Sequence, residues 1–248
     1  MSTPMKKERL DRMLFDKGLV ESREKARALI LAGIVSVNGI VVDKAGAQVR
    51  PDDELTLANK MPYVSRGGLK LEHALKDFDI DVKNKVAMDV GASTGGFTDC
   101  LLQNGAIKVY AVDVGYGQID LKLRNNERVS VLEKTNIRYL ERSAVQDDID
   151  IATIDVSFIS LLKVMPKVLE FLKPGGEIVA LIKPQFEAGR KDVGKGGVVK
   201  DERIHQQVIE NMKAGSESMG LEILGTATSP IKGPKGNVEF LIHLRKHV

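Results

Sequence analysis

Residues 86–99 read VAMDVGASTGGFTD, an apolar run followed by a glycine-rich segment. The run predicts a buried strand over residues 86–90, and the glycines predict a turn that opens a helix. Such a turn leaves the first N–H groups of the helix pointing at whatever lies over it. Gly91, Gly95 and Gly96 allow a ligand to approach the backbone there. The segment therefore predicts a ligand site at a strand-to-helix turn.

The spacing of the glycines indicates which ligand to expect. They follow G-x-x-x-G-G, and not the G-x-G-x-x-G of dinucleotide sites. With Asp89 two residues before the first glycine, the turn resembles the S-adenosylmethionine loop of Rossmann-like methyltransferases. An ordinary tight turn between strand and helix stays open as the alternative from this segment alone.

The composition is that of an ordinary globular protein. The 248 residues suffice for a small domain joined to a larger one, with 43% hydrophobic and 29% charged residues. No apolar run approaches the ~18 residues of a membrane span, and the N-terminal stretch lacks a signal peptide's apolar core. Cys100 is the single cysteine, which excludes an intrachain disulfide and a multi-cysteine zinc site. We therefore expect a cytoplasmic protein with no metal and no membrane partner.

The charge is mildly positive. A net charge of +3 permits a polyanionic partner without requiring one. The first 27 residues contain eight Lys or Arg against five acids, a pattern that charge alone explains as a solvated helix face. Aromatic residues make up only 4% of the chain, so extensive base stacking is not expected.

Residues 1–58 form a pattern of their own. Apolar positions from Leu10 onward mark one amphipathic helix, and Ser22 can cap a second helix that ends at Gly33. Residues 35–42 then read VSVNGIVV and predict a β-hairpin that turns at the Asn-Gly pair. A domain this small buries little core, so we expect it to dock and not to catalyse.

Helix, helix and hairpin in this order resemble the S-four-like RNA-binding domain, named from a small-subunit ribosomal protein. The motifs RLDRML at 9–14, SREKARALI at 22–30 and the VNG turn carry the resemblance. It implies RNA phosphate contacts that the charge pattern alone did not predict, from Arg9, Arg12, Arg23, Lys25 and Arg27. Residues 59–68, with Pro62 and a Gly-Gly pair, are expected to be a linker, in which Arg66 also contacts RNA.

From residue 69 to 248, strand and helix patterns alternate, which predicts an α/β domain with a mostly parallel sheet covered by helices. Strands are expected at 86–90, 108–112, 129–132, 149–154, 177–182, 222–227 and 238–244. Helices are expected at 69–78, 96–104, 159–172 and 201–219, the third kinked or starting later because of Pro166. Seven strands that end in a hairpin-like pair suit a Rossmann-like methyltransferase.

Polar residues follow five of the predicted strands, at the edge of the sheet where a ligand is expected to bind. In open α/β sheets, ligands bind beyond the carboxyl ends of the strands. Five predicted strands end at Asp89, Asp113, Thr135-Asn136, Asp155 and Lys183. Each alone could be a solvated strand-end residue, but their convergence favours a site. Asp113 is placed like an acid that holds a ribose hydroxyl, and Asn136 lies where an adenine could be met.

Two charged residues fall where burial is expected. Lys183 directly follows a strand expected to be fully buried, so it needs a carboxylate partner or a lowered pKa. Asp155, at the end of the neighbouring strand, is the natural partner. Glu239 falls inside an otherwise apolar strand, where a carboxylate is costly unless it is paired. An outward-facing strand glutamate is the alternative for Glu239.

The chain contains a set of four charged residues that matches, in order and context, the Lys-Asp-Lys-Glu set of FtsJ-like ribose 2′-O-methyltransferases. The four residues are Lys70, Asp155, Lys183 and Glu239. With the S-four-like domain in front, the whole chain resembles the TlyA (hemolysin A) family of rRNA methyltransferases. The segments SRGGLK, DVGASTGGFTD, IDVSFI and IKPQFE carry this resemblance together. Asn136 departs from the family, which usually carries an aspartate there.

The resemblance implies S-adenosylmethionine as cofactor, a ribose hydroxyl as methyl acceptor, and ribosomal RNA or ribosomal subunits as partner. It implies that Lys183 acts as general base or orients the hydroxyl, and that Glu239 orients Lys70 or the ribose. The expected cofactor contacts are Asp89, Gly91, Ser93, Gly95, Gly96, Phe97, Asp113, Asn136 and Asp155.

Two other functions are weighed against this one. An RNA-binding assembly factor with a vestigial site is disfavoured by the intact four-residue set. A membrane-active haemolysin is disfavoured because the sequence contains no spanning segment and no obvious amphipathic membrane helix. The basic, glycine-rich segment 189–200 is either a loop that closes on RNA or a flexible connection. The methylated nucleotide, the ribosomal subunit and the oligomeric state do not follow from the sequence.

Overall fold

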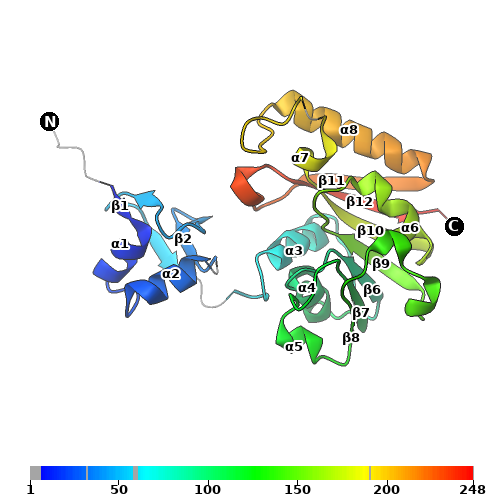
Figure 1. Cartoon of the computed structure of the whole chain (residues 1–248), viewed down its shortest axis with the longest axis horizontal. Helices are drawn as coiled ribbons and strands as arrows, with labels where there is room; N and C mark the ends of the chain where they lie inside the picture. Colours follow the sequence, from blue (N-terminus) through cyan, green and yellow to red (C-terminus); the bar gives the residue numbers. More distant parts are fainter. Residues whose placement is uncertain (1–6, 32, 58–60, 190, 248) are drawn as a thin grey trace. The chain divides into compact units, whose positions relative to one another are not determined.

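The computed structural model describes residues 7–31, 33–57, 61–189 and 191–247 (Figure 1). The chain divides into two compact units, Met1–Arg66 and Gly67–Val248. Their boundary falls within the segment 59–68 that the sequence predicts as a linker. Two residues of that segment, Asn59 and Lys60, lie outside the described residues.

The first unit pairs two helices with short antiparallel strands. Its elements are β1 (Glu8–Arg9), α1 (Leu10–Asp16), α2 (Arg23–Leu31), β2 (Val35–Val37), β3 (Ile40–Val41), β4 (Gln48–Val49) and β5 (Leu55–Leu57). The strands form a sheet in the order β3-β2-β5 and a separate β1-β4 ribbon. Asn38 and Gly39 have φ angles of 51° and 76°, as a tight type I′ turn requires, which confirms the predicted hairpin.

The first unit has a small core. Its buried apolar side chains are Leu10, Met13, Leu14, Ala26, Ile30, Val35 and Val49. They come from both helices and from β2 and β4, so the two helices are fixed against the strands.

The second unit is built on a seven-stranded sheet. Its strands are β6 (Val86–Val90), β7 (Lys108–Val112), β8 (Val129–Leu132), β9 (Ile149–Ile154), β10 (Leu172–Ile182), β11 (Leu221–Thr228) and β12 (Phe240–Lys246). They lie in the order β11-β12-β10-β9-β6-β7-β8. From β8 to β10 all neighbours are parallel, while β12 runs antiparallel to both β10 and β11. The mostly parallel sheet and its terminal hairpin-like pair are confirmed.

The helices of the second unit are α3 (Gly67–Asp77), α4 (Gly96–Gln103), α5 (Leu121–Arg124), α6 (Met165–Leu169), α7 (Pro184–Glu187) and α8 (Glu202–Ser218). Short 3₁₀ turns are η1 (Ile137–Tyr139), η2 (Arg142–Ala144), η3 (Leu161–Lys163) and η4 (Pro234–Gly236). The helix expected over 159–172 starts later, as the position of Pro166 indicated, and is shorter: the segment forms η3 and then α6. Pro166 lies in the first turn of α6, where its missing N–H costs nothing. No helix in the described ranges is long and apolar enough to cross a membrane.

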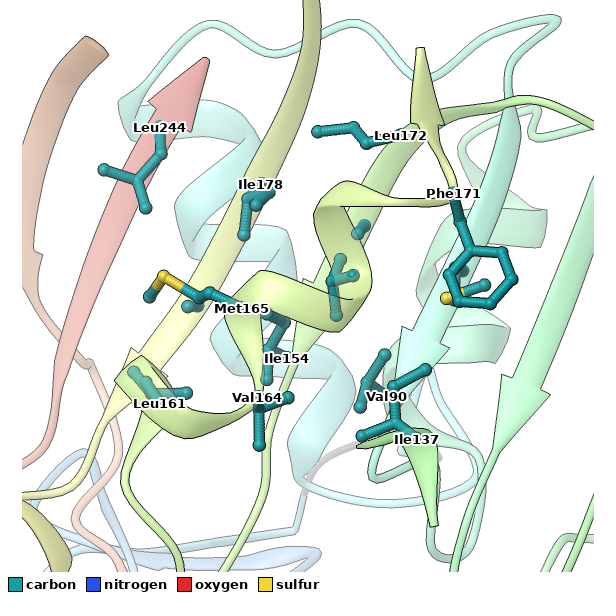
Figure 2. Packing of buried hydrophobic residues seen from close by; sticks show 14 of the residues in the cluster. Val90, Ile137, Ile154, Leu161, Val164, Met165, Phe171, Leu172, Ile178 and Leu244 are labelled. Carbon is teal, nitrogen blue, oxygen red and sulfur yellow. The ribbon is translucent and has the colours of Figure 1, made fainter. Parts of the chain in front are cut away.

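The main core lies between the sheet and the helices α6 and α8. Met165 of α6 lies in one buried cluster with Ile154, Ile178 and Leu244 of three neighbouring strands (Figure 2). Met212 of α8 belongs to the same cluster. In the same view, α3 lies behind the sheet. Because both faces of the sheet are packed, its strand ends are held rigidly, and the loops that follow them are the parts free to carry chemistry.

Candidate active site

A cavity of about 980 Å³ lies beyond the carboxyl ends of β6, β7 and β9. This volume is in the range of small-molecule sites. Five residues expected to contact the cofactor line it, namely Gly91, Ser93, Asp113, Asn136 and Asp155. The lining also includes Val114, Gln118, Arg138 and Phe158, which the sequence analysis did not single out. They lie in loops and in the short turn η1 after the strands, where no periodic pattern distinguishes one exposed residue from another.

The glycines of the turn are required by contacts within the protein. Gly91 has a φ of +87°, and a Cβ on it would lie 2.4 Å from the carbonyl oxygen of Asp155. Gly95 has a φ of +94°, and a Cβ there would lie 2.3 Å from Leu123 Cδ1. These two glycines therefore also let the turn contact the end of β9 and α5, and the expected approach of a ligand to the turn stays a prediction.

Asp89 holds the start of α4 and does not face the cavity. Its side chain is 0% exposed. Its Oδ2 accepts hydrogen bonds from the backbone N (2.9 Å) and Oγ1 (2.7 Å) of Thr98, and its Oδ1 accepts one from Thr153 Oγ1 (3.1 Å). Burial outweighs these donors and raises the pKa of Asp89 to about 7.

Three other residues expected to contact the cofactor are, like Asp89, not among the residues that line the cavity. Among the described residues, Asp89, Gly95, Gly96 and Phe97 are absent from the cavity lining. Phe97 is buried in the first turn of α4, and Gly95 precedes that helix with a left-handed backbone. These four residues shape the turn and its helix, and their expected contacts with the cofactor stay predictions.

Asp113 joins the loops that follow β6 and β7. Its Oδ2 accepts a hydrogen bond from the backbone N of Ser93 (2.7 Å), and its Oδ1 accepts one from the backbone N of Gly115 (2.6 Å). An ionised carboxylate has acceptor sites beyond these two bonds, so Asp113 can also bind hydroxyls in the cavity. Asn136 caps η1 through its Oδ1, which accepts from the backbone N of Arg138 (3.1 Å). Its amide NH₂ donors are not used by that bond.

Lys183 and Asp155 form the ion pair expected from the sequence. Lys183 Nζ lies 2.5 Å from Asp155 Oδ1 and donates a hydrogen bond to Ser157 Oγ at 3.0 Å. Lys183 follows β10 and is buried, while Asp155 follows β9 and lines the cavity. Lys183 itself is not among the lining residues, but its amine is held by two groups that are, Asp155 and Ser157.

Lys70 and Glu239 form a second ion pair. Lys70 Nζ, on α3, lies 2.6 Å from Glu239 Oε2, and both residues are buried. Glu239 precedes β12, which corrects the expectation that it lies inside that strand. The antiparallel register ends with the pair of Ile182 and Phe240, and Lys183 and Glu239 are the next residue on each chain. The register thus places one member of each ion pair at the same end of two neighbouring strands.

One oxygen of Glu239 is left without a partner. Within the part of the chain that the structure describes, Glu239 Oε1 is buried and has no hydrogen-bond partner. A Cβ on Gly233 would lie 2.0 Å from this oxygen, so the missing side chain of Gly233 makes its space. A buried acceptor without a donor is unfavourable, and this orphan oxygen points to a hydroxyl or amine supplied by a ligand.

Phe158 has an unusual backbone at the rim of the cavity. Its φ is +65°, a conformation that bulky residues rarely adopt, and its side chain is 90% exposed. Its ring lies 4.9 Å from that of Phe186, which follows Lys183 by three residues. Backbone strain of this kind is often found at functional sites, and here it holds an exposed aromatic ring in the lining of the cavity, beside that of Phe186.

The segment 189–200 is anchored where the structure describes it. Arg190 lies outside the described residues. The backbone N of Val199 donates to Asn237 Oδ1 at 3.0 Å, and Asn237 Nδ2 donates to the carbonyl oxygen of Gly197 at 3.0 Å. Because Asn237 is itself buried two residues before Glu239, the end of this segment is tied to the strand that positions Glu239.

The six basic residues expected to contact RNA all belong to the first unit. Arg9, Arg23 and Arg27 pair with Asp11, Arg12 pairs with Asp16, and Arg66 pairs with Asp43. The side chain of Lys25 is exposed. Asp11, which pairs with three of these arginines, was not identified as a functional residue from the sequence.

Comparison with known proteins gives two family matches. Residues 63–246 match the family described as FtsJ-like methyltransferase, and residues 8–55 match the S4 domain. The chain is 52% identical to the Bacillus subtilis protein YqxC over 96% of its own length and 86% of that protein. It is 42% identical to the Mycobacterium tuberculosis 16S/23S rRNA (cytidine-2'-O)-methyltransferase TlyA, over 96% of this chain and 89% of the relative. A solved structure from Streptococcus thermophilus matches with 47% identity and a TM-score of 0.77, over 98% of this chain and 90% of that one.

Proposed function

This chain belongs to the TlyA family of FtsJ-like methyltransferases, and we propose that it transfers a methyl group from S-adenosylmethionine to a ribose 2′-hydroxyl of ribosomal RNA. The observation that carries the proposal is a set of two ion pairs, Lys183–Asp155 and Lys70–Glu239. Asp155 lines the cavity, and Lys183 and Glu239 come directly after the last register pair of two neighbouring strands. A ribose hydroxyl is a poor nucleophile while it keeps its proton, so its methylation needs groups that orient it and remove that proton.

The cavity residues suit S-adenosylmethionine. The volume of the cavity accommodates a nucleoside with an amino-acid tail. Asp113 would hold the ribose hydroxyls, the amide of Asn136 would meet the adenine, and the turn at Gly91 and Ser93 would face the methionine portion. When bound, this cofactor supplies an electrophilic methyl group on a cationic sulfur.

Lys183 is the group proposed to act on the acceptor. Asp155 and Ser157 fix the direction of its amine, as their distances of 2.5 and 3.0 Å from Nζ indicate. As the ribose oxygen bonds to the methyl carbon, the bond from that carbon to sulfur would break and release S-adenosylhomocysteine. The hydroxyl proton would pass to the Lys183–Asp155 pair, where the amine takes it up as the carboxylate accepts the proton of the ammonium. The same carboxylate that aims Lys183 lines the cofactor cavity, so the proton acceptor and the methyl donor are held at a common wall.

Glu239 and Lys70 are proposed to hold the ribose in place. The pairing of Lys70 with Glu239 Oε2 compensates both buried charges. The orphan Oε1 of Glu239 is then available to accept a hydrogen bond from a ribose hydroxyl. In this assignment, Lys70 and Glu239 position the acceptor and Lys183 receives its proton.

The test is methyl transfer to isolated ribosomal subunits. Purified protein would be incubated with radiolabelled S-adenosylmethionine and 30S or 50S subunits from cells that lack this protein, and 2′-O-methylated positions would be mapped in each rRNA. We expect label in rRNA at a position that is also methylated in cells that contain the protein. Tight binding to subunits without label in either rRNA would overturn the proposal in favour of an assembly factor with a vestigial site.

A further inference from the structure

Asp11 gathers three arginine side chains around one buried carboxylate. Arg9 approaches it with two nitrogens, Nε at 2.9 Å from Oδ1 and Nη2 at 2.9 Å from Oδ2. Arg27 Nε lies 3.1 Å from Oδ2, and Arg23 Nη2 lies 3.4 Å from the same oxygen. The arginines come from β1 and from two positions of α2 that are four residues apart, which places the latter pair on one helix face.

The charges of this cluster do not cancel. Three guanidinium groups around one carboxylate leave an excess of two positive charges. The Asp11 side chain is fully buried, whereas the three arginine side chains are 44 to 52% exposed. Each guanidinium has five N–H donors, and the four hydrogen bonds to Asp11 leave most of them facing outward. The hydrogen bond from Arg9, more than any other contact, holds the pKa of Asp11 well below its usual range, so the carboxylate stays ionised.

We propose that Asp11 is a positioning residue that holds Arg9, Arg23 and Arg27 together as one binding site for an RNA phosphate. The inference rests on the proposed function, because it takes an RNA substrate as given. Phosphate oxygens accept hydrogen bonds from guanidinium groups in the same planar geometry as a carboxylate, so the outward donors match them. Because the three long side chains are already held in place before RNA binds, less side-chain conformational entropy is lost on binding.

A second acid on the same helix provides a matched control. Asp16 is the last residue of α1 and pairs with Arg12 four residues earlier, with both side chains exposed. Asp11→Asn and Asp16→Asn each remove one negative charge from α1. If the basic surface acted through net charge alone, both variants would bind RNA more tightly.

The positioning role predicts opposite results for the two variants. With isolated 30S and 50S subunits as probes, we expect Asp11→Asn to bind about tenfold more weakly than the unchanged protein, because the arginines lose their common anchor. The KM for subunits should rise by a similar factor while kcat is retained, since the methyl-transfer residues are untouched. Asp16→Asn should bind equally or more tightly. Tighter binding by a folded Asp11→Asn variant would overturn the inference.

A second pair of variants applies if Asp11→Asn unfolds the first unit, as thermal unfolding would reveal. Arg23→Lys keeps the charge of the most distant arginine but removes its planar group, and Arg12→Lys makes the same change outside the cluster. We expect weaker subunit binding for Arg23→Lys and little change for Arg12→Lys. Equal binding by the two variants would overturn the inference. Failure of the unchanged protein to bind or methylate either subunit would instead overturn the proposed function.

Discussion

Lys183 and Glu239 both come directly after the last register pair of two antiparallel strands, which joins Ile182 to Phe240. Each is also paired with a residue from elsewhere in the chain, Lys183 with Asp155 and Glu239 with Lys70. The hydrogen-bonded ladder of β10 and β12 therefore sets the spacing of the two ion pairs. This relationship makes the proposed roles of the four residues separately testable.

Replacing Lys183 should remove methyl transfer and leave cofactor binding. We expect Lys183→Ala to lower kcat by at least about 100-fold, the contribution of a positioned acid or base, because the hydroxyl proton loses its acceptor. The Kd for S-adenosylmethionine, measured by calorimetry, should change little. Lys173→Ala is the control, since Lys173 lies in the same strand β10 and pairs with Asp150 away from the cavity. Normal turnover by Lys183→Ala would exclude the assigned role.

Adding a single methyl group at Gly233 should disturb Glu239 without disturbing the fold. The new Cβ would lie 2.0 Å from Glu239 Oε1, the far end of a side chain, while the φ of Gly233 is an ordinary −69°. We expect Gly233→Ala to lower kcat roughly 100-fold through displacement of the carboxylate, with a nearly unchanged melting temperature. Glu239→Gln should lower kcat to a similar degree. Full activity of Gly233→Ala would show that the position of Oε1 does not matter.

Gly91 should tolerate no side chain. Alanine there meets both a left-handed backbone and the carbonyl oxygen of Asp155, and we expect Gly91→Ala to lose about 3 kcal/mol of unfolding free energy and to bind S-adenosylmethionine poorly. Gly117 has a φ of +68° but nothing within 4 Å of its Cβ position. Gly117→Ala should therefore lose only about 1 kcal/mol. Equal melting temperatures for the two variants would contradict the role assigned to the Asp155 contact.

The ionisation of Asp89 should appear in the pH dependence of stability. Its pKa is raised from 3.8 to about 7, so the folded state binds more protons than the unfolded state between these values. Asp89 therefore contributes stability at low pH that is lost as the pH rises toward 7. Asn is neutral throughout, so the melting temperature of the unchanged protein should fall relative to that of Asp89→Asn between about pH 4 and pH 7. Parallel curves for the two proteins would mean that Asp89 does not titrate in this window.

The sheet could be predicted closely because its signals are local. β6, β7, β8 and β9 begin and end at the residues predicted, since each is a short apolar run bounded by turn residues. The segment 159–172 was harder, because its apolar residues suit one long helix. Only packing against the sheet favours two short pieces that meet near Pro166.

The candidate site was predictable where chemistry follows a strand end. Lys183 and Asp155 stood out because a buried lysine needs a partner, and the structure places them together. The role of Asp89 was not predictable, because its partners Thr98 and Thr153 lie on other elements and are known only from the folded arrangement. The strained backbone of Phe158 likewise leaves no mark on the sequence pattern.

Asp155 belongs to both halves of the proposed chemistry. Its carbonyl oxygen contacts the turn at Gly91, its carboxylate holds Lys183, and the residue lines the cavity. The kinetic constants of Asp155 variants will consequently combine two effects, weaker binding of the methyl donor and a misplaced amine of Lys183. A clean separation of binding from chemistry needs substitutions at residues that serve only one of them, such as Asn136 on one side and Glu239 on the other.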